Sequence, residues 1–105
     1  MDKMPNLGDM AGMLKQLRQM QGELVKAQNE LAKEMVVAEV GKGAVKVMIT
    51  GDQRVTNLEI NPDLLTSGNA DRLNQLLLEA LNNALNESRE LAKKRLGPLT
   101  GGLGL

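Results

Sequence analysis

A long helical pattern opens the chain. From about Asp9 to Glu34 the apolar positions recur at alternating intervals of three and four, a heptad seam sustained for about three heptads. The seam consists of Met10, Met13, Leu17, Met20, Leu24, Ala27 and Leu31. A helix of this span is roughly 39 Å long at about 1.5 Å per residue. One small sheet cannot cover that length, so we expect part of the helix to project or to lie along another helix.

The next segment changes to alternating apolar and polar residues, the period of half-buried strands. It predicts strands at 35–40, 44–50 and 54–60, with glycine-assisted turns between them. Two sets of side chains are each expected to share a face: Val45, Val47 and Ile49 in the second strand, and Thr56, Leu58 and Ile60 in the third. A lone hairpin is marginal in water, so this sheet needs a helix or a partner to cover its apolar face.

A second long helix is predicted after a short helical turn at 62–65. It should begin near Asn69 and end at about Leu96, because Gly97–Pro98 is typical of a helix end. The order of elements predicts an α+β fold: a long N-terminal helix, a three-stranded antiparallel meander and a long C-terminal helix. We expect one domain over 1–105, with flexible ends at 1–8 and 98–105.

The second helix is apolar over an arc of about 200°, twice the stripe of roughly 100° that one packing contact requires. A helix of this kind should contact two surfaces, its own sheet and a second subunit, which favours a homodimer. Oligomerisation is also a natural source of extra burial for a chain of 105 residues. The residues expected in the core or the dimer contact are Leu17, Leu24, Val47, Ile49, Leu81 and Leu85.

The amino-acid composition excludes several kinds of chemical site. The chain contains no Phe, Tyr, Trp, Cys or His, so disulfides, thiolate chemistry and zinc sites built on Cys are excluded. The absence of histidine removes the commonest general base and metal ligand. We therefore expect no enzyme, no cofactor and no metal. No run approaches the roughly 20 apolar residues of a membrane span, and the N-terminus does not read as a signal peptide, which favours a cytoplasmic protein without membrane contact.

Thirteen basic and thirteen acidic residues give a formal net charge of zero, so binding of nucleic acid depends on where the charges lie. Lys15, Arg18, Lys26 and Lys33 fall within about 80° of one another on the first helix, opposite the seam, with Gly22 in the same stripe. One interpretation is a solvated face steadied by pairs such as Glu23 with Lys26 and Glu30 with Lys33. The other is a stripe that follows DNA phosphates, with Gly22 allowing close approach.

The second helix carries its own cations near its C-terminal end. Arg89 and Lys93 share an exposed stripe with amide residues, and Lys94 and Arg95 are close by. Cations in a last helical turn complement the helix dipole, which is a structural explanation for this cluster. Amides and arginine on one stripe also suit contacts to phosphates and base edges.

The ordered set of segments resembles the YbaB/EbfC family of small bacterial nucleoid-associated proteins. MLKQLRQMQ at 13–21 is similar to that family's first-helix signature. The stretch 41–65, GKGAVKVMITGDQRVTNLEINPDLL, is similar to its core pattern of G-x-G-x-V-K-V, N/T-G-D and V-x-x-x-x-I-D/N-P. LLLEALNNAL and LTGGL are similar to its second helix and its tail. The sequence departs from the pattern at Asn61, where aspartate is common before proline, at Gln53, where glycine is frequent, and in NADRL, which is less acidic than expected.

The resemblance implies an intertwined homodimer with projecting helices that binds double-stranded DNA with little sequence preference, and a nucleoid-associated location. No catalytic motif comes with it. Residues expected to contact DNA phosphates are Lys15, Arg18, Lys26, Arg89, Lys93 and Lys94. The alternative is a dimeric adaptor whose long helices grip another protein, which the neutral charge and the methionine-rich seam favour. An enzyme is a distant third hypothesis, because Asp52 beside a glycine turn has no accompanying base or nucleophile.

Overall fold

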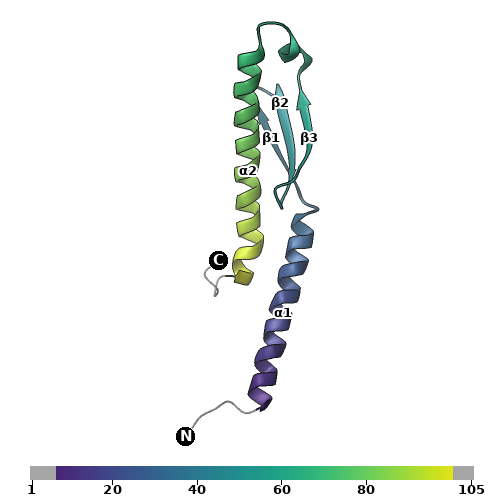
Figure 1. The fold of residues 1–105 in the computed structure, drawn as a ribbon, viewed down its shortest axis with the longest axis vertical. Helices are drawn as coiled ribbons and strands as arrows, with labels where there is room; N and C mark the ends of the chain where they lie inside the picture. Colours follow the sequence, from purple (N-terminus) through teal and green to yellow (C-terminus); the bar gives the residue numbers. More distant parts are fainter. Residues whose placement is uncertain (1–6, 101–105) are drawn as a thin grey trace.

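The computed structural model describes residues 7–100. Along the chain the elements are α1 (Leu7–Leu31), β1 (Met35–Val40), β2 (Val45–Thr50), β3 (Val55–Ile60), the short 3-10 helix η1 (Pro62–Leu65) and α2 (Ala70–Thr100) (Figure 1). Two long helices and a three-stranded antiparallel sheet confirm the predicted α+β order. The second and third strands each begin one residue later than the alternation predicted.

The core lies between the sheet and α2. The strand order is β1-β2-β3 with antiparallel pairing, so β2 is central and the two other strands form the edges. Val45, Val47 and Ile49 on β2 are fully buried, as their alternation predicts. They face α2, where Ala80 and Ala84 are also fully buried, because small side chains let the helix approach the sheet closely. α2 packs mainly on β1 and β2.

The third strand differs from the prediction at Thr56. Met48 pairs with Asn57 and Ile49 pairs with Val55, which leaves Thr56 as the extra residue of a β-bulge. Its hydroxyl donates to the Met48 carbonyl at 3.4 Å and lies 3.9 Å from the Met35 sulfur, on the face of the sheet away from α2. The expectation that Thr56 shares a face with Leu58 was therefore wrong. A strict period of two cannot anticipate an inserted residue.

The end of α2 also corrects the prediction. The helix continues through Gly97 and Pro98 to Thr100 instead of ending at Leu96. A proline disfavours helical backbone in the residue before it, partly because its Cδ clashes with the Cβ of that residue. Gly97, the residue before Pro98, has no Cβ. Pro98 also lies only two residues before the helix end, where one lost backbone hydrogen bond costs little of the helix. Of the ends expected to be flexible, 7–8 and 98–100 are helical, and 1–6 and 101–105 lie outside the described residues.

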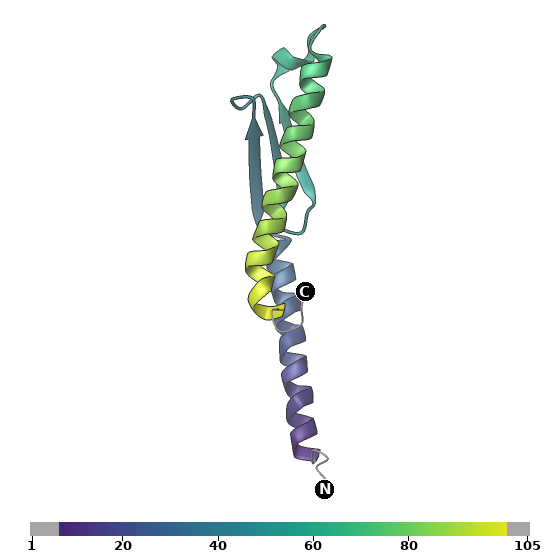
Figure 2. The same cartoon turned by 90° about the vertical axis from the view of Figure 1, so that its left-hand side faces the viewer.

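The protein is elongated. Its radius of gyration is 21.6 Å and its long axis 79 Å, whereas a compact chain of this length has a radius near 13 Å. α2 lies along the sheet, and α1 leaves the lower end of the sheet and extends away from it, past the end of α2 (Figures 1 and 2). The projection expected from the length of the first helix is thus present.

The residues expected in the core or the dimer contact fall into three environments. Val47 and Ile49 are fully buried in the protomer. Leu81, Leu85 and Leu24 are half-buried, the first two packed against the core. Leu17, on the projecting part of α1, is 54% exposed. The protomer alone therefore leaves much of the predicted apolar surface uncovered.

Candidate nucleic-acid interface

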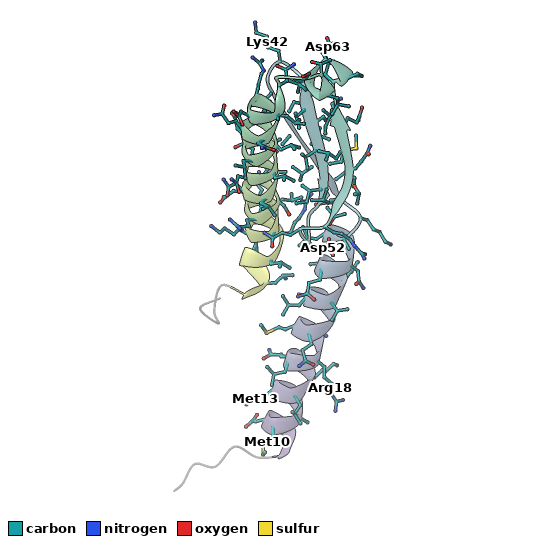
Figure 3. All side chains as sticks on the ribbon, turned by 45° about the horizontal axis from the view of Figure 1, so that its top comes forward. Met10, Met13, Arg18, Lys42, Asp52 and Asp63 are labelled. Atoms are coloured by element: carbon teal, nitrogen blue, oxygen red, sulfur yellow. The ribbon has the colours of Figure 1, made fainter. Side chains whose placement is uncertain are left out.

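α1 has two faces with different surroundings. Its seam turns toward the rest of the protein near the sheet, where Leu31 is buried and Leu24 and Ala27 are half-buried. Toward the N-terminus the seam runs beyond α2, and Met10 and Met13 are 50% and 59% exposed. The cations Lys15, Arg18, Lys26 and Lys33 are all exposed. The helix ends at Leu31 and not at Glu34 as predicted, so Lys33 lies in the turn after α1 and not on its stripe. Lys15, Arg18 and Lys26 lie opposite the seam and therefore face away from α2. Figure 3 shows Met13 and Arg18 on different sides of the projecting helix.

The cations of this stripe have no ion-pair partner in the part of the chain that the structure describes. Lys15, Arg18 and Lys26 form no ion pair with any residue between 7 and 100. The solvated-face interpretation required ion pairs of Glu23 with Lys26 and of Glu30 with Lys33. Neither pair is formed. A Cβ added at Gly22 would meet no atom within 4 Å, so the stripe is sterically open at its centre. Its charges are available to an external anion.

The cations of α2 are more occupied. The Arg89 Nη1 donates to the Asn86 side chain at 3.3 Å. The Lys93 Nζ lies 3.4 Å from the Glu90 carboxylate in an exposed pair. Lys94 is exposed and forms no ion pair with the described residues. Of the three cations predicted on α2 to contact DNA, only Lys94 has no side-chain partner among residues 7–100.

The helix dipole does not account for this cluster as the sequence suggested. Because α2 continues to Thr100, its last turn contains no basic residue. Lys93 and Lys94 lie more than a turn before the end, and the dipole effect fades within the last turn. The dipole explanation was based on a helix end at Leu96 and is wrong.

Arg95 has a different role from its neighbours. Its Nη2 and Nε donate to the two Glu34 carboxylate oxygens at 2.6 Å and 3.3 Å, tying α2 to the segment that follows α1. The hydrogen bond and the negative charge of Glu34 raise the pKa of Arg95 above its ordinary value. Because its pKa is raised, the Arg95 guanidinium stays charged at neutral pH and can hold Glu34 there. The tie leaves Arg95 less available to a ligand.

The structure does not unite the six predicted cations in one cluster. Arg89 and Lys93 line an open groove of about 620 Å³ with Gln28, Asn29 and Asp52. Lys93 and Lys94 line a second hollow on the β1 side, together with Glu87 and Glu90. Lys15, Arg18 and Lys26 belong to neither, since they lie along the outer face of α1. The structure thus separates a continuous stripe on α1 from a divided group on α2.

Sequence reasoning missed the residues that hold this arrangement together. Ser88 is fully buried, and its hydroxyl donates to the Thr50 carbonyl at 2.8 Å. A serine within the apolar arc of the second helix was the available signal. Gly51 was assigned only to a turn, yet it touches the end of α1. The pair between Glu34 and Arg95 joins residues 61 positions apart, and no local pattern announces it.

Neither a candidate metal cluster nor a membrane-spanning helix is found in the described part of the chain. Between residues 7 and 100 there is no cluster of three or more carboxylates suited to a metal ion. None of the helices in that range has a stretch both long and apolar enough to cross a bilayer. Asp52 accepts a hydrogen bond from the Thr50 hydroxyl within its own turn, which gives it a structural role.

The structure is thus a small α+β protein whose projecting helix carries a stripe of exposed cations that form no ion pair with residues 7–100. A family model described as the YbaB/EbfC DNA-binding family matches residues 6–103. The chain belongs to this family.

Relatives across several bacteria support the assignment. The chain is 40% identical over 100 residues to a nucleoid-associated protein of Pelodictyon phaeoclathratiforme, covering 95% of this chain and 86% of that protein. It is 38% identical to a nucleoid-associated protein of Mycobacteroides abscessus, covering 91% and 84%. The crystal structure of an uncharacterized protein from Helicobacter pylori matches with a TM-score of 0.72 at 21% identity, over 87% of this chain and 92% of that one. This last likeness shows a shared fold.

Proposed function

We propose that the protein is a nucleoid-associated homodimer that binds double-stranded DNA through phosphate contacts, with little sequence preference, and alters the conformation of the DNA. The observation that carries the proposal is the stripe of exposed cations on α1 that form no ion pair with residues 7–100, in a chain whose family is described as DNA-binding. Phosphate contacts fix position but carry no sequence information, so a stripe of lysine and arginine suits binding without a preferred site.

Segregation of charge supports the proposal despite a net charge of zero. Some cations elsewhere are paired with acidic side chains, as Lys46 is with Glu39 at 3.2 Å and Arg95 is with Glu34 at 2.6 Å. The cations of α1 form no ion pair with residues 7–100. From Lys15 to Lys26 they span about 16 Å of helix, a length over which B-DNA carries about ten phosphate charges.

The homodimer is supported by an apolar side that the protomer leaves open. α2 packs mainly on β1 and β2, so the inward face of β3 is exposed, with Val55 at 47% and Leu58 at 43%. Leu78 of α2 is 63% exposed. Leu78, Leu85 and Ala92 are seven residues apart and so lie in one stripe of the helix. Ala92 lies beside the turn that leads into β3. A second copy of the chain placed on this side would bury all three exposed residues.

The test is DNA affinity as a function of salt. A duplex of random sequence is titrated with the protein by fluorescence anisotropy at several NaCl concentrations, and the mass of the free protein is measured by sedimentation. Each neutralised phosphate contributes a slope of about −0.9 in log affinity against log salt. We expect a dimer and a slope of several units. Affinity that does not change with salt, or a stable monomer at micromolar concentration, would contradict the proposal.

A second candidate function rests on the apolar seam at the free end of α1. Met10, Met13 and Leu17 are each at least half exposed there, and a surface of this kind suits a groove on another protein. In this case the protein would be a dimeric adaptor. The two functions differ in one measurement, because an adaptor of this kind would show no DNA binding even at low salt.

A further inference from the structure

The C-terminal end of α1 is held by the backbone of the turn between β2 and β3. The Gly51 N–H donates to the Leu31 carbonyl at 2.9 Å and to the Glu34 carbonyl at 3.0 Å. Carbonyls in the last turn of a helix have no partner within the helix and need one from outside. Gly51, twenty residues further along the chain than Leu31, supplies one, beside the Glu34 N–H, which donates to the same Leu31 carbonyl at 3.2 Å. Figure 3 shows the neighbouring Asp52 where the sheet meets α1.

The position of Gly51 has no room for a side chain. A Cβ there would lie 2.7 Å from the Leu31 Cδ2 and 2.8 Å from the Leu31 carbonyl oxygen. The backbone of Gly51 is not left-handed, so glycine is required here for space. The Cδ2 atom could rotate away, but the carbonyl oxygen belongs to the helix backbone. Any larger residue must therefore move the end of α1 away from the turn.

The same turn is fastened to α2. Ser88, fully buried on α2, donates from its hydroxyl to the Thr50 carbonyl at 2.8 Å. Within the turn, the Arg54 N–H donates to the Thr50 hydroxyl at 3.0 Å, and that hydroxyl donates to Asp52. On the solvent side, Arg95 of α2 holds Glu34 through two hydrogen bonds. The turn thus connects the end of α1 to both the sheet and α2.

We infer that this joint, made by Gly51, Thr50, Ser88 and the Glu34–Arg95 pair, sets the direction of α1, with Gly51 as the positioning residue. The inference deepens the proposed function, since it rests on α1 carrying the cations that bind DNA. The direction matters because α1 is about 37 Å long and is held mainly at one end. A rotation of about 10° at the joint would move the far end by about 6 Å, or nearly two phosphate steps along one DNA strand.

The experiment measures the direction of α1 without DNA. Because the chain has no cysteine, Gln19→Cys on α1 and Asn83→Cys on α2 can carry a pair of spin labels, and both positions are exposed. Labelled chains are mixed with an excess of unlabelled protein, so that each dimer holds at most one labelled copy. The distance distribution is recorded for the otherwise native protein, for Gly51→Ala, and for Gly12→Ala. Gly12 is the matched control, because its added methyl meets no atom within 4 Å.

We expect Gly51→Ala to shift or broaden the distribution and Gly12→Ala to leave it unchanged, with the helix content of both intact by circular dichroism. DNA affinity should fall in parallel. If the aligned orientation decreases to about a tenth of the population, the apparent Kd rises about tenfold. A folded Gly51→Ala protein with the native distribution would overturn the inference.

A second variant covers the case in which Gly51→Ala does not fold. Ser88→Ala removes one oxygen, and the Thr50 carbonyl keeps its bond from the Gln53 N–H at 3.0 Å, so we expect this protein to fold. A broadened distribution in Ser88→Ala supports the joint, and an unchanged one overturns it. The joint and the proposed function fail separately. If the native protein does not bind DNA while these variants still change the distribution, the proposed function is wrong and the joint stands.

Discussion

Neutralising two cations of α1 gives the sharpest test of where DNA binds. Lys15 and Arg18 are exposed, lie away from the apolar seam and form no ion pair with the described residues, so Lys15→Gln with Arg18→Gln should leave the fold and the dimer intact. A dimer loses four cations in this variant. If each contacts one phosphate, the salt slope becomes shallower by about 3.6, at about 0.9 per contact. When NaCl is raised from 50 to 200 mM, the factor by which affinity falls should therefore be about 150 times smaller for the variant than for the native protein.

The assay is fluorescence anisotropy on a labelled duplex at several salt concentrations, with sedimentation to confirm the dimer. The stronger variant, Lys15→Glu with Arg18→Glu, should abolish binding at every salt concentration. The matched control is Lys42→Gln with Arg72→Gln, which makes the same change in net charge at the opposite end of the molecule, where Figure 3 shows Lys42. Equal slopes for the α1 variant and the native protein would show that this stripe is only a solvated face.

Three other substitutions test separate parts of the structure. Leu78→Glu should dissociate the dimer without unfolding the protomer, because this leucine is 63% exposed and burial of that exposed part in both subunits is worth about 2–4 kcal/mol in total. Sedimentation measures the dissociation, with Asn83→Glu as the control, and an unaffected dimer would place the interface elsewhere. Gln53→Gly should stabilise the protein by about 0.5–1 kcal/mol in thermal unfolding, since Gln53 has φ of 68°, and a lower Tm would contradict this explanation. Gly22→Ala should add about 1 kcal/mol of helix stability. It should leave DNA affinity unchanged, because the long lysine and arginine side chains of the stripe hold the phosphates away from the helix backbone. A loss of affinity would show that the backbone itself approaches DNA.

Periodicity was sufficient for the elements but not for their ends. The interval pattern of α1 and the alternation of β2 are local properties, and Val45, Val47 and Ile49 are buried as predicted. The bulge at Thr56 and the continuation of α2 through Gly97–Pro98 depend on what surrounds each residue. A bulge is defined by the partner strand, and a proline near a helix end is tolerated or not according to its neighbours.

The contacts that place the candidate site are even less visible in sequence. Ser88 and Thr50 are 38 positions apart, and Glu34 and Arg95 are 61 apart. Each is an ordinary polar residue in its own segment. In the sequence Gly51 looks like an ordinary turn residue. Only the structure shows that the end of α1, at the Leu31 carbonyl, occupies the space that a side chain at position 51 would need. Charges on one helix face can be predicted from spacing, whereas the direction in which that face points cannot.

The direction of α1 explains how a chain with no net charge can present a cationic surface. Its seam and its cations lie on opposite sides, so packing the seam against α2 or a partner necessarily turns the cations outward. Near the sheet the seam is covered by the protomer itself, where Leu31 is buried. Toward the N-terminus Met10 and Met13 have no such cover, and the orientation there depends on the stiffness of the helix and on the joint at its other end. Proposed DNA binding and the packing of the joint are therefore coupled: a change that loosens Gly51 from Leu31 should weaken binding even though every cation is still present.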